Sequence, residues 1–128
     1  MIGVHEVCRN LVVRFDPLTL MELGAYPSTS AGLAVQGLHY FLCLERCGPY
    51  SVWVPAFSRA SNGRIRLKWK GGLDSWVDPE SYVDATQLWI IPDAALGPAS
   101  IADPTTRGFR NFASTFFLFP ASELAATG

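Results

Sequence analysis

The sequence predicts a mainly β protein, a small antiparallel barrel of roughly five or six strands with one short C-terminal helix. Three observations support this prediction. Short apolar segments are separated by turn residues, the chain holds 11 Gly and 9 Pro, and aromatic residues make up 12% of it. These features favour short strands over long helices. At 128 residues the chain has the length of one domain, residues 1–128, which is long enough to bury a core.

Composition limits the function classes. Hydrophobic residues make up 49% and charged residues 16%, which is atypical of a disordered chain and low in charge for a free monomer. We therefore expect part of the apolar surface to form an interface, with a homo-oligomer or another protein partner. The net charge of −1 provides no overall attraction to nucleic acid, so any such contact must come from a local basic patch.

The chain shows no apolar run of the roughly 18 to 20 residues that cross a bilayer, and its first ten residues lack the pattern of a signal peptide. A cytoplasmic protein with no membrane partner is the expectation. Three cysteines are an odd number, so a disulfide framework is not expected. Zinc binding by Cys8, Cys43, Cys47 and the two histidines is conceivable, but buried thiols are the favoured interpretation and no metal is predicted.

The first strand is predicted at residues 11–15, where Asp16-Pro17 ends it. Residues 18–23 suit either one helical turn or a short strand. Small and turn-forming residues fill positions 24–37, which indicates a surface loop with a short strand at 33–35.

The organising stretch is His39 to Ser58, a predicted hairpin. Residues 40–45 are nearly all apolar until Glu45, which indicates a central strand buried on both faces. Residues 46–50 carry Gly48-Pro49 and form the turn, 51–54 return as the partner strand, and Pro55 ends regular pairing.

The clearest period follows. From Arg64 to Lys70 basic and hydrophobic residues alternate without exception, so Ile65, Leu67 and Trp69 are predicted to face the core. The four cations would then stand in one row on the other face, about 6.5 to 7 Å apart, which is close to the phosphate repeat of a nucleic-acid strand.

Acidic residues dominate after this row. Residues 75–82 are predicted as loop or a short helical turn, and 87–91 as a strong strand stopped by Pro92. Asp93 would cap a short helix at 94–96. The phenylalanines at 109, 112, 116 and 119 have helical spacing, which favours a helix over 108–117, although 115–119 also suits a strand.

The basic segment supplies a candidate binding surface for RNA or another polyanion, with Trp53, Trp76 and Tyr82 as possible stacking platforms. The alternative is a solvated or acid-paired face that protects a sheet edge. His39 and Ser58 are the candidate catalytic residues, as general acid or base and hydroxyl group. GxSxG and the phosphate-binding glycine motifs do not occur, so no nucleotide cofactor is predicted. The predicted binding residues are Arg59, Arg64, Arg66, Lys68, Lys70 and Trp53.

The order of residues 37–44, then 52–58, then a basic strand, then 81–85 before a final strand resembles the PemK/MazF-like toxins and related SH3-like barrels. The resemblance covers about half the chain. It implies an SH3-like barrel that cleaves RNA without metal and pairs with an antitoxin. Where that family places Arg-Pro and Thr-Ser, this chain has His39-Tyr40 and Phe57-Ser58. Two functions are therefore carried forward: an RNA-binding or RNA-cleaving domain, and a non-enzymatic protein-interaction module or homo-oligomer subunit.

Overall fold

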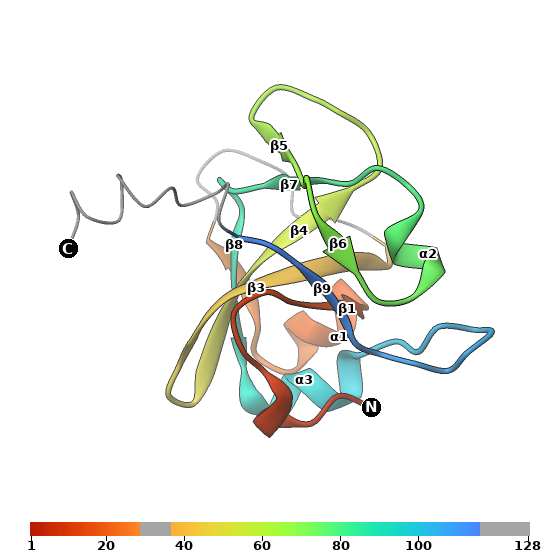
Figure 1. Cartoon of the computed structure of the whole chain (residues 1–128). Helices are drawn as coiled ribbons and strands as arrows, with labels where there is room; N and C mark the ends of the chain where they lie inside the picture. Colours follow the sequence, from red (N-terminus) through yellow and green to blue (C-terminus); the bar gives the residue numbers. More distant parts are fainter. Residues whose placement is uncertain (29–36, 116–128) are drawn as a thin grey trace.

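One antiparallel sheet organises the protein in the computed structural model, which describes residues 1–28 and 37–115 (Figure 1). Within these residues nine strands are connected, and the main pairing order is β2-β8-β4-β3-β1-β9-β6, with β7 pairing to β4 and β5 to β7. The predicted mainly β, antiparallel fold is confirmed. The sheet does not close into a barrel.

The elements follow one another closely along the chain. In order they are a 3-10 turn η1 (Val4–Glu6), β1 (Leu11–Phe15), α1 (Pro17–Glu22), β2 (Tyr26–Ser28), β3 (His39–Cys47), β4 (Tyr50–Phe57), β5 (Arg64–Arg66), β6 (Lys70–Gly71), α2 (Asp74–Val77), β7 (Tyr82–Asp84), β8 (Leu88–Pro92), α3 (Asp93–Ala99) and β9 (Asn111–Ala113).

The predicted hairpin is the centre of the sheet. β3 and β4 pair from Phe41 opposite Pro55 to Cys47 opposite Tyr50, with a bulge after Cys43. β1 flanks β3 on its other side. Residues 41–44 of β3 are buried and Glu45 is exposed, because alternate side chains enter two different apolar layers until the strand leaves the core. The prediction of a central strand buried on both faces is confirmed.

Strand β4 changes partner along its length. Its first half, Tyr50 to Trp53, pairs with β8, and Ala56-Phe57 pair with β7. β7 in turn pairs with β5, so the far end of β4 carries the small β7-β5 extension drawn at the top of Figure 1. The main path of paired strands ends at β6, and the branch through β7 ends at β5. These two strands do not pair with each other, and residues 67–69 connect them along the chain, so the sheet stays open between them.

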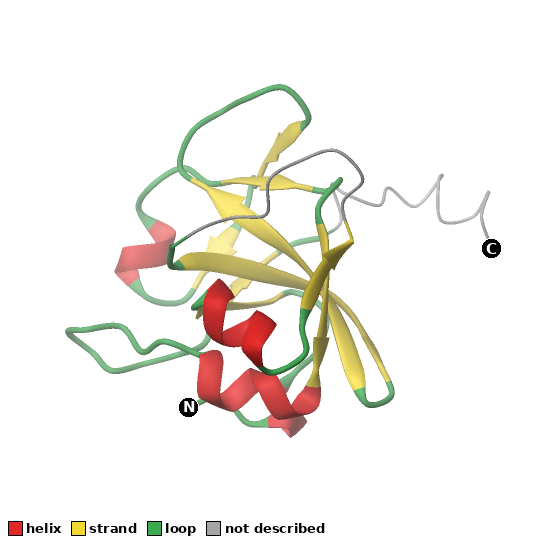
Figure 2. Ribbon diagram, turned by 180° about the vertical axis from the view of Figure 1, so that it is seen from behind, coloured by secondary structure: helices red, strands yellow, loops and turns green. Residues whose placement is uncertain are grey.

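Two apolar clusters lie on opposite faces of the central strands. The first joins Phe15, Phe41, Trp53 and Trp89 to the helices, and α1 and α3 lie together against this side of the sheet (Figure 2). The second joins Val12, Leu42 and Val54 to residues of β7, α2 and β9. Neighbouring residues of β1 and β3 thus serve different clusters, as the two-residue period of a strand requires.

The helices settle two open alternatives. Of residues 18–23, all but the C-cap Leu23 fall in helix α1. The helix starts after Asp16, whose carboxylate accepts the Leu18 amide at 3.0 Å and the Thr19 hydroxyl at 3.2 Å. Pro17 at the first helical position has no amide to lose. Residues 74–77 form α2, which overlaps the start of the segment 75–82 predicted as loop or a short helical turn. The helix expected at 94–96 is longer, Asp93–Ala99, and Asp93 lies inside its first turn.

Three sequence predictions are corrected. The helix over 108–117 is wrong for its described part, because Asn111–Ala113 pair as β9 with β1 and β6. The loop at 24–37 contains strand β2, and the strand predicted at 33–35 lies outside the described residues, as do positions 116 and 117. The single strand over 64–70 is interrupted after Arg66, and Trp69 is 55% exposed instead of facing the core.

Candidate functional site

A cleft of about 490 Å³ opens where the start of β3 and the end of β4 meet the segment between α2 and β7. Arginines from three different strand regions line it. We call it the arginine cleft, and its polar and aromatic lining consists of Arg14, His39, Tyr40, Phe57, Ser58, Arg59, Arg64, Ser75, Trp76, Glu80 and Ser81.

The cleft unites part of the predicted site. His39 opens β3 and Ser58 follows β4, and the antiparallel pairing of the two strands brings both to the same end of the hairpin. Arg59 and Arg64 line the same space. The hairpin register therefore accounts for the proximity of His39 and Ser58, and two of the five predicted basic residues line the cleft with them.

His39 is held in a defined tautomer. Its Nδ1 lies 3.0 Å from the carbonyl oxygen of Ala56, and a carbonyl only accepts, so Nδ1 carries the hydrogen. The neutral ring then keeps the lone pair of Nε2 available as a base. The Phe57 ring meets the imidazole edge to face with centroids 5.1 Å apart, which further fixes its orientation.

Arg64 is also pre-oriented. Its guanidinium lies 3.7 Å from the centroid of the Phe57 ring, and Nη1 donates to the Arg59 carbonyl at 2.9 Å. Arg14 approaches from β1, where it pairs with Tyr40 of β3. Three arginines and one glutamate, Glu80, are the lining groups with full charge, so the cleft carries a net charge of +2 with His39 neutral.

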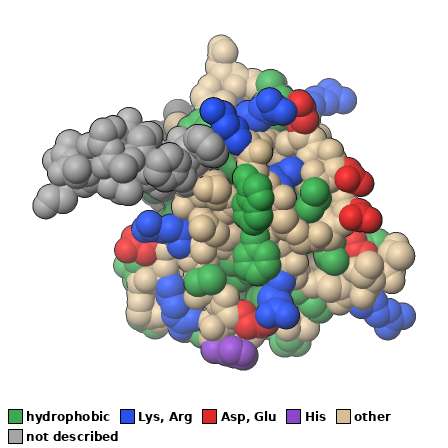
Figure 3. Space-filling model, viewed as in Figure 1, with side chains coloured by type: hydrophobic (Ala, Val, Ile, Leu, Met, Phe, Trp, Pro, Cys, Tyr) green, Lys and Arg blue, Asp and Glu red, His purple; other side chains and the backbone are tan. Residues whose placement is uncertain are grey.

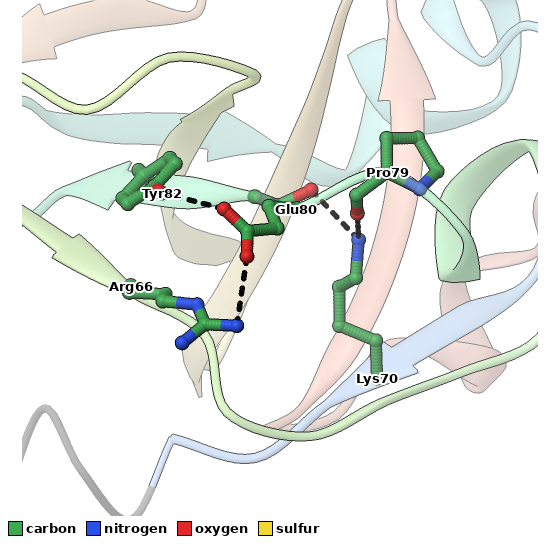
Figure 4. A network of polar contacts seen from close by, with 6 residues as sticks. Arg66, Lys70, Pro79, Glu80 and Tyr82 are labelled. Atoms are coloured by element: carbon green, nitrogen blue, oxygen red, sulfur yellow. Dashed lines mark hydrogen bonds and ion pairs between the residues drawn. The ribbon is translucent and has the colours of Figure 1, made fainter.

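The Glu80 carboxylate is bound by two side chains that lie outside the arginine cleft. Arg66 Nη2 donates to Glu80 Oε1 at 2.9 Å, and the Tyr82 hydroxyl donates to Oε2 at 3.0 Å (Figure 4). This hydrogen bond to Glu80 is the main reason that the pKa of Tyr82 is raised. The one acidic group of the arginine cleft is thus held by two side chains that lie outside it.

Lys70 points back into the protein instead of continuing a basic row. Its ammonium group donates to the Pro79 carbonyl (Figure 4). It also donates to the Trp76 carbonyl at 2.5 Å and to the Ser81 hydroxyl at 2.9 Å. It also lies 4.5 Å from the Trp76 ring centroid. Burial lowers the pKa of Lys70, while Asp78 and Glu80 oppose this shift. Lys70 therefore ties down the wall of the cleft.

Arg66, Lys68 and Lys70 line a second, smaller space. This depression of about 290 Å³, which we call the lysine hollow, also contains Trp69, and Pro79 and Glu80 line both it and the arginine cleft. The basic residues predicted as one row are therefore divided between two adjacent depressions, with the Pro79-Glu80 segment between them.

The tryptophans do not take the expected places. Trp53 is 0% exposed, with its Nε1 donating to the Ser51 hydroxyl at 2.7 Å, and Trp76 is 1% exposed. Neither presents a free face to a base, which removes Trp53 from the candidate surface. Sequence reasoning missed Arg14 and Tyr40; an arginine inside the otherwise apolar β1 was the signal that could have identified the first.

No group of three or more His, Cys, Asp or Glu residues that could hold a metal ion occurs in residues 1–28 and 37–115. The three cysteines are free thiols, with Cys8 exposed and Cys43 buried. Among the helices of the described part of the chain, none is long and apolar enough to span a membrane.

Comparison with known proteins gives no match: no protein-family model, no curated protein and no solved structure is similar to this chain.

Proposed function

We propose that the protein binds single-stranded RNA in the arginine cleft. The observation that supports this best is the arrival of Arg14, Arg59 and Arg64 at one concave site with aromatic walls. Guanidinium groups match phosphate oxygens in two-point hydrogen bonds, and aromatic side chains beside them suit unpaired bases. A duplex hides its base faces, so a cleft of this composition favours single strands.

Preorganisation strengthens this proposal. Arg64 is already oriented by the Phe57 ring and the Arg59 carbonyl, so it loses little freedom when it meets a phosphate. Tyr40 is held in the same way, because its hydroxyl donates to Ser75 at 3.1 Å and its ring lies 5.0 Å from Trp76. The walls of the cleft are thus fixed before any ligand arrives.

Metal-independent cleavage of the bound RNA is a second part of the proposal, favoured by the tautomer of His39. Its Nε2 would take the proton of a ribose 2′-hydroxyl, whose oxygen attacks the neighbouring phosphorus. The bond from phosphorus to the 5′-oxygen of the next nucleotide then breaks, which leaves a 2′,3′-cyclic phosphate, and the departing oxygen takes a proton from water. The arginines would stabilise the charge that develops on the phosphate. Cleavage would agree with a PemK/MazF-like role in the cytoplasm, which the resemblance implies and which remains part of this proposal.

Salt-dependent binding to a labelled RNA oligonucleotide tests the first part. We expect Arg64→Ala to weaken binding by about tenfold, because it removes one charge-assisted contact. It should also lower the slope of log affinity against log salt by about 0.7. Arg110→Ala is the matched control, since Arg110 is 61% exposed, pairs with Glu6 and lies outside the cleft. Equal behaviour of the two variants would refute the proposed binding site.

Cleavage is tested separately by incubating the RNA with wild type, His39→Gln and Ser58→Ala. The expected product ends in a 2′,3′-cyclic phosphate, and its formation should fall by at least about a hundredfold in His39→Gln with affinity retained. An intact substrate after incubation with the wild type would leave binding as the function and exclude catalysis.

A self-association module is the alternative class, and one observation favours it. Apolar side chains are exposed on α1 and β2: Leu18 is 66% exposed, Met21 39% and Tyr26 56%. Strand β2 ends the pairing path, so a partner there would meet apolar side chains beside a strand. Sedimentation of wild type and Leu18→Glu tests this, and a wild type that stays monomeric at high concentration would exclude the homo-oligomer.

A further inference from the structure

Trp69 stands apart from the other tryptophans. It is 55% exposed, whereas Trp53, Trp76 and Trp89 are 0%, 1% and 0% exposed. Tryptophan side chains are usually buried, either in the core of a protein or in an interface with a ligand or partner. The ring lies close over Gly71: a Cβ added there would meet ring carbons of Trp69 at 3.1 Å. Glycine at 71 therefore lets the indole lie low against the backbone, with its outer side in solvent.

The surroundings of Trp69 suit a polyanion with an apolar face. Arg66, Lys68 and Lys70 share the lysine hollow with it, against Asp78 and Glu80, which gives a net charge of +1. Phe112 is 40% exposed on β9, directly opposite Gly71 in the register. In Figure 3 hydrophobic side chains lie near the middle of the face that presents β6 and β9, with basic side chains around them.

The lysine hollow adjoins the arginine cleft. Pro79 and Glu80 line both, and Trp69 stands five positions after Arg64, so their Cα atoms are at most about 18 Å apart. A few nucleotides of an extended strand can cover such a distance. A strand with a phosphate in the arginine cleft can therefore place a later base beside the indole.

We propose that Trp69 is the stacking platform for an unpaired base of the RNA strand that leaves the arginine cleft. The inference rests on the proposed function and adds the residue that makes RNA affinity depend on the length of the strand. Stacking on one aromatic side chain is worth about a five- to hundredfold change in affinity and tolerates every base. Trp69 thus takes the role that the sequence suggested for Trp53.

Affinity as a function of oligonucleotide length tests this, with RNAs of about two to about eight nucleotides. For the wild type we expect a rise of about five- to hundredfold once the strand reaches Trp69. Trp69→Ala should lose this rise and retain the affinity for the shortest RNA, whereas Trp69→Phe should keep most of it. A rise of equal size in Trp69→Ala would overturn the proposal.

Fluorescence supplies an independent readout, because Trp69 is the one tryptophan that solvent reaches. Long RNA should quench the emission of the wild type, and the quenching should disappear in Trp69→Phe although binding remains. If RNA binding is intact but Trp69→Ala converts an oligomer to a monomer in sedimentation, Trp69 belongs to a protein interface and the proposal is wrong. If Arg64→Ala leaves the affinity for every length unchanged, the proposed function itself fails instead.

Discussion

Lys70→Met should weaken both the fold and the arginine cleft, because it removes the ammonium group that holds the wall between α2 and β7. The wild-type group donates to Trp76, Pro79 and Ser81, all three of which line the cleft. Methionine preserves most of the aliphatic stem. The loss is therefore mainly that of the hydrogen bonds and of the contact with the Trp76 ring.

Hydrogen bonds from a charged donor each contribute about 1.5 to 3 kcal/mol when shielded, and less at a half-exposed site such as this one. Relief of the desolvation of Lys70 offsets part of the loss. We expect Lys70→Met to lower the free energy of unfolding by about 2 kcal/mol. RNA affinity should also fall, by about threefold to tenfold, because the wall then samples other positions.

Urea unfolding followed by tryptophan fluorescence measures the first effect, and RNA titration the second. Arg107→Met is the control, since it removes one positive charge from an exposed side chain that lies outside the arginine cleft and the lysine hollow. Its effect on stability should stay within about 0.5 kcal/mol. If Lys70→Met is as stable as Arg107→Met, the three hydrogen bonds do not hold the wall and the reasoning fails.

Three further predictions concern stability and reactivity. Leu42→Ala should lower the free energy of unfolding in urea by about 2 to 5 kcal/mol, since Leu42 is 0% exposed. The control Leu18→Ala should lower it by under about 0.5 kcal/mol. A loss below about 1 kcal/mol for Leu42→Ala would contradict the central position of Leu42. Hydrogen bonds from the Thr106 amide, the Ser75 hydroxyl and the Thr105 amide lower the pKa of Asp103 from 3.8 to about 2. On acidification the carboxyl group therefore binds its proton in the unfolded state before it does so in the folded state. The free energy of unfolding of wild type should exceed that of Asp103→Asn above about pH 4, and this difference should vanish toward pH 2. A difference that does not depend on pH would refute this. Burial raises the pKa of Cys43 from 9.0 to about 12, so a thiol reagent near pH 8 should modify exposed Cys8 in the native protein and Cys43 only after unfolding.

Local patterns predicted the elements whose environment is uniform. Residues 11–15 are a strand as expected, and the continuous apolar run at 40–44 indicated a strand buried on both faces. The hairpin turn followed from Gly48, which has a φ of 62°. In residues 11–15 and 40–44 nearly all side chains are apolar and buried, so hydrophobicity predicts the local structure.

Segments that change partner were mispredicted. The alternation from Arg64 to Lys70 implied one strand, but β5 pairs with β7 and β6 with β9, and the chain turns between them at residues 67–69. Trp69 falls in this turn and faces solvent. The spacing of Phe109 and Phe112 suggested a helix, yet the free edge of β1 offers a strand partner there. Such outcomes depend on non-local pairing, which no period within the segment encodes.

The candidate site was predictable only where the hairpin joins its parts. His39 begins the hairpin and Ser58 directly follows it, so antiparallel pairing places both at the same end. Arg14 comes from β1, and the pairing of β1 with β3 decides its position. The division of the basic residues between two depressions depends on the Pro79-Glu80 segment, whose place no local pattern indicated.

The position of β1 between β3 and β9 has a consequence for biosynthesis. The Thr115 amide donates to the Asn10 side chain at 3.0 Å across 105 positions of sequence, so the edge of β1 is completed by one of the last described segments of the chain. At a synthesis rate of about 5 to 20 residues per second, this edge waits about 5 to 20 s for its partner. During that interval a newly made chain exposes an apolar strand, which makes early folding intermediates the stage most vulnerable to aggregation.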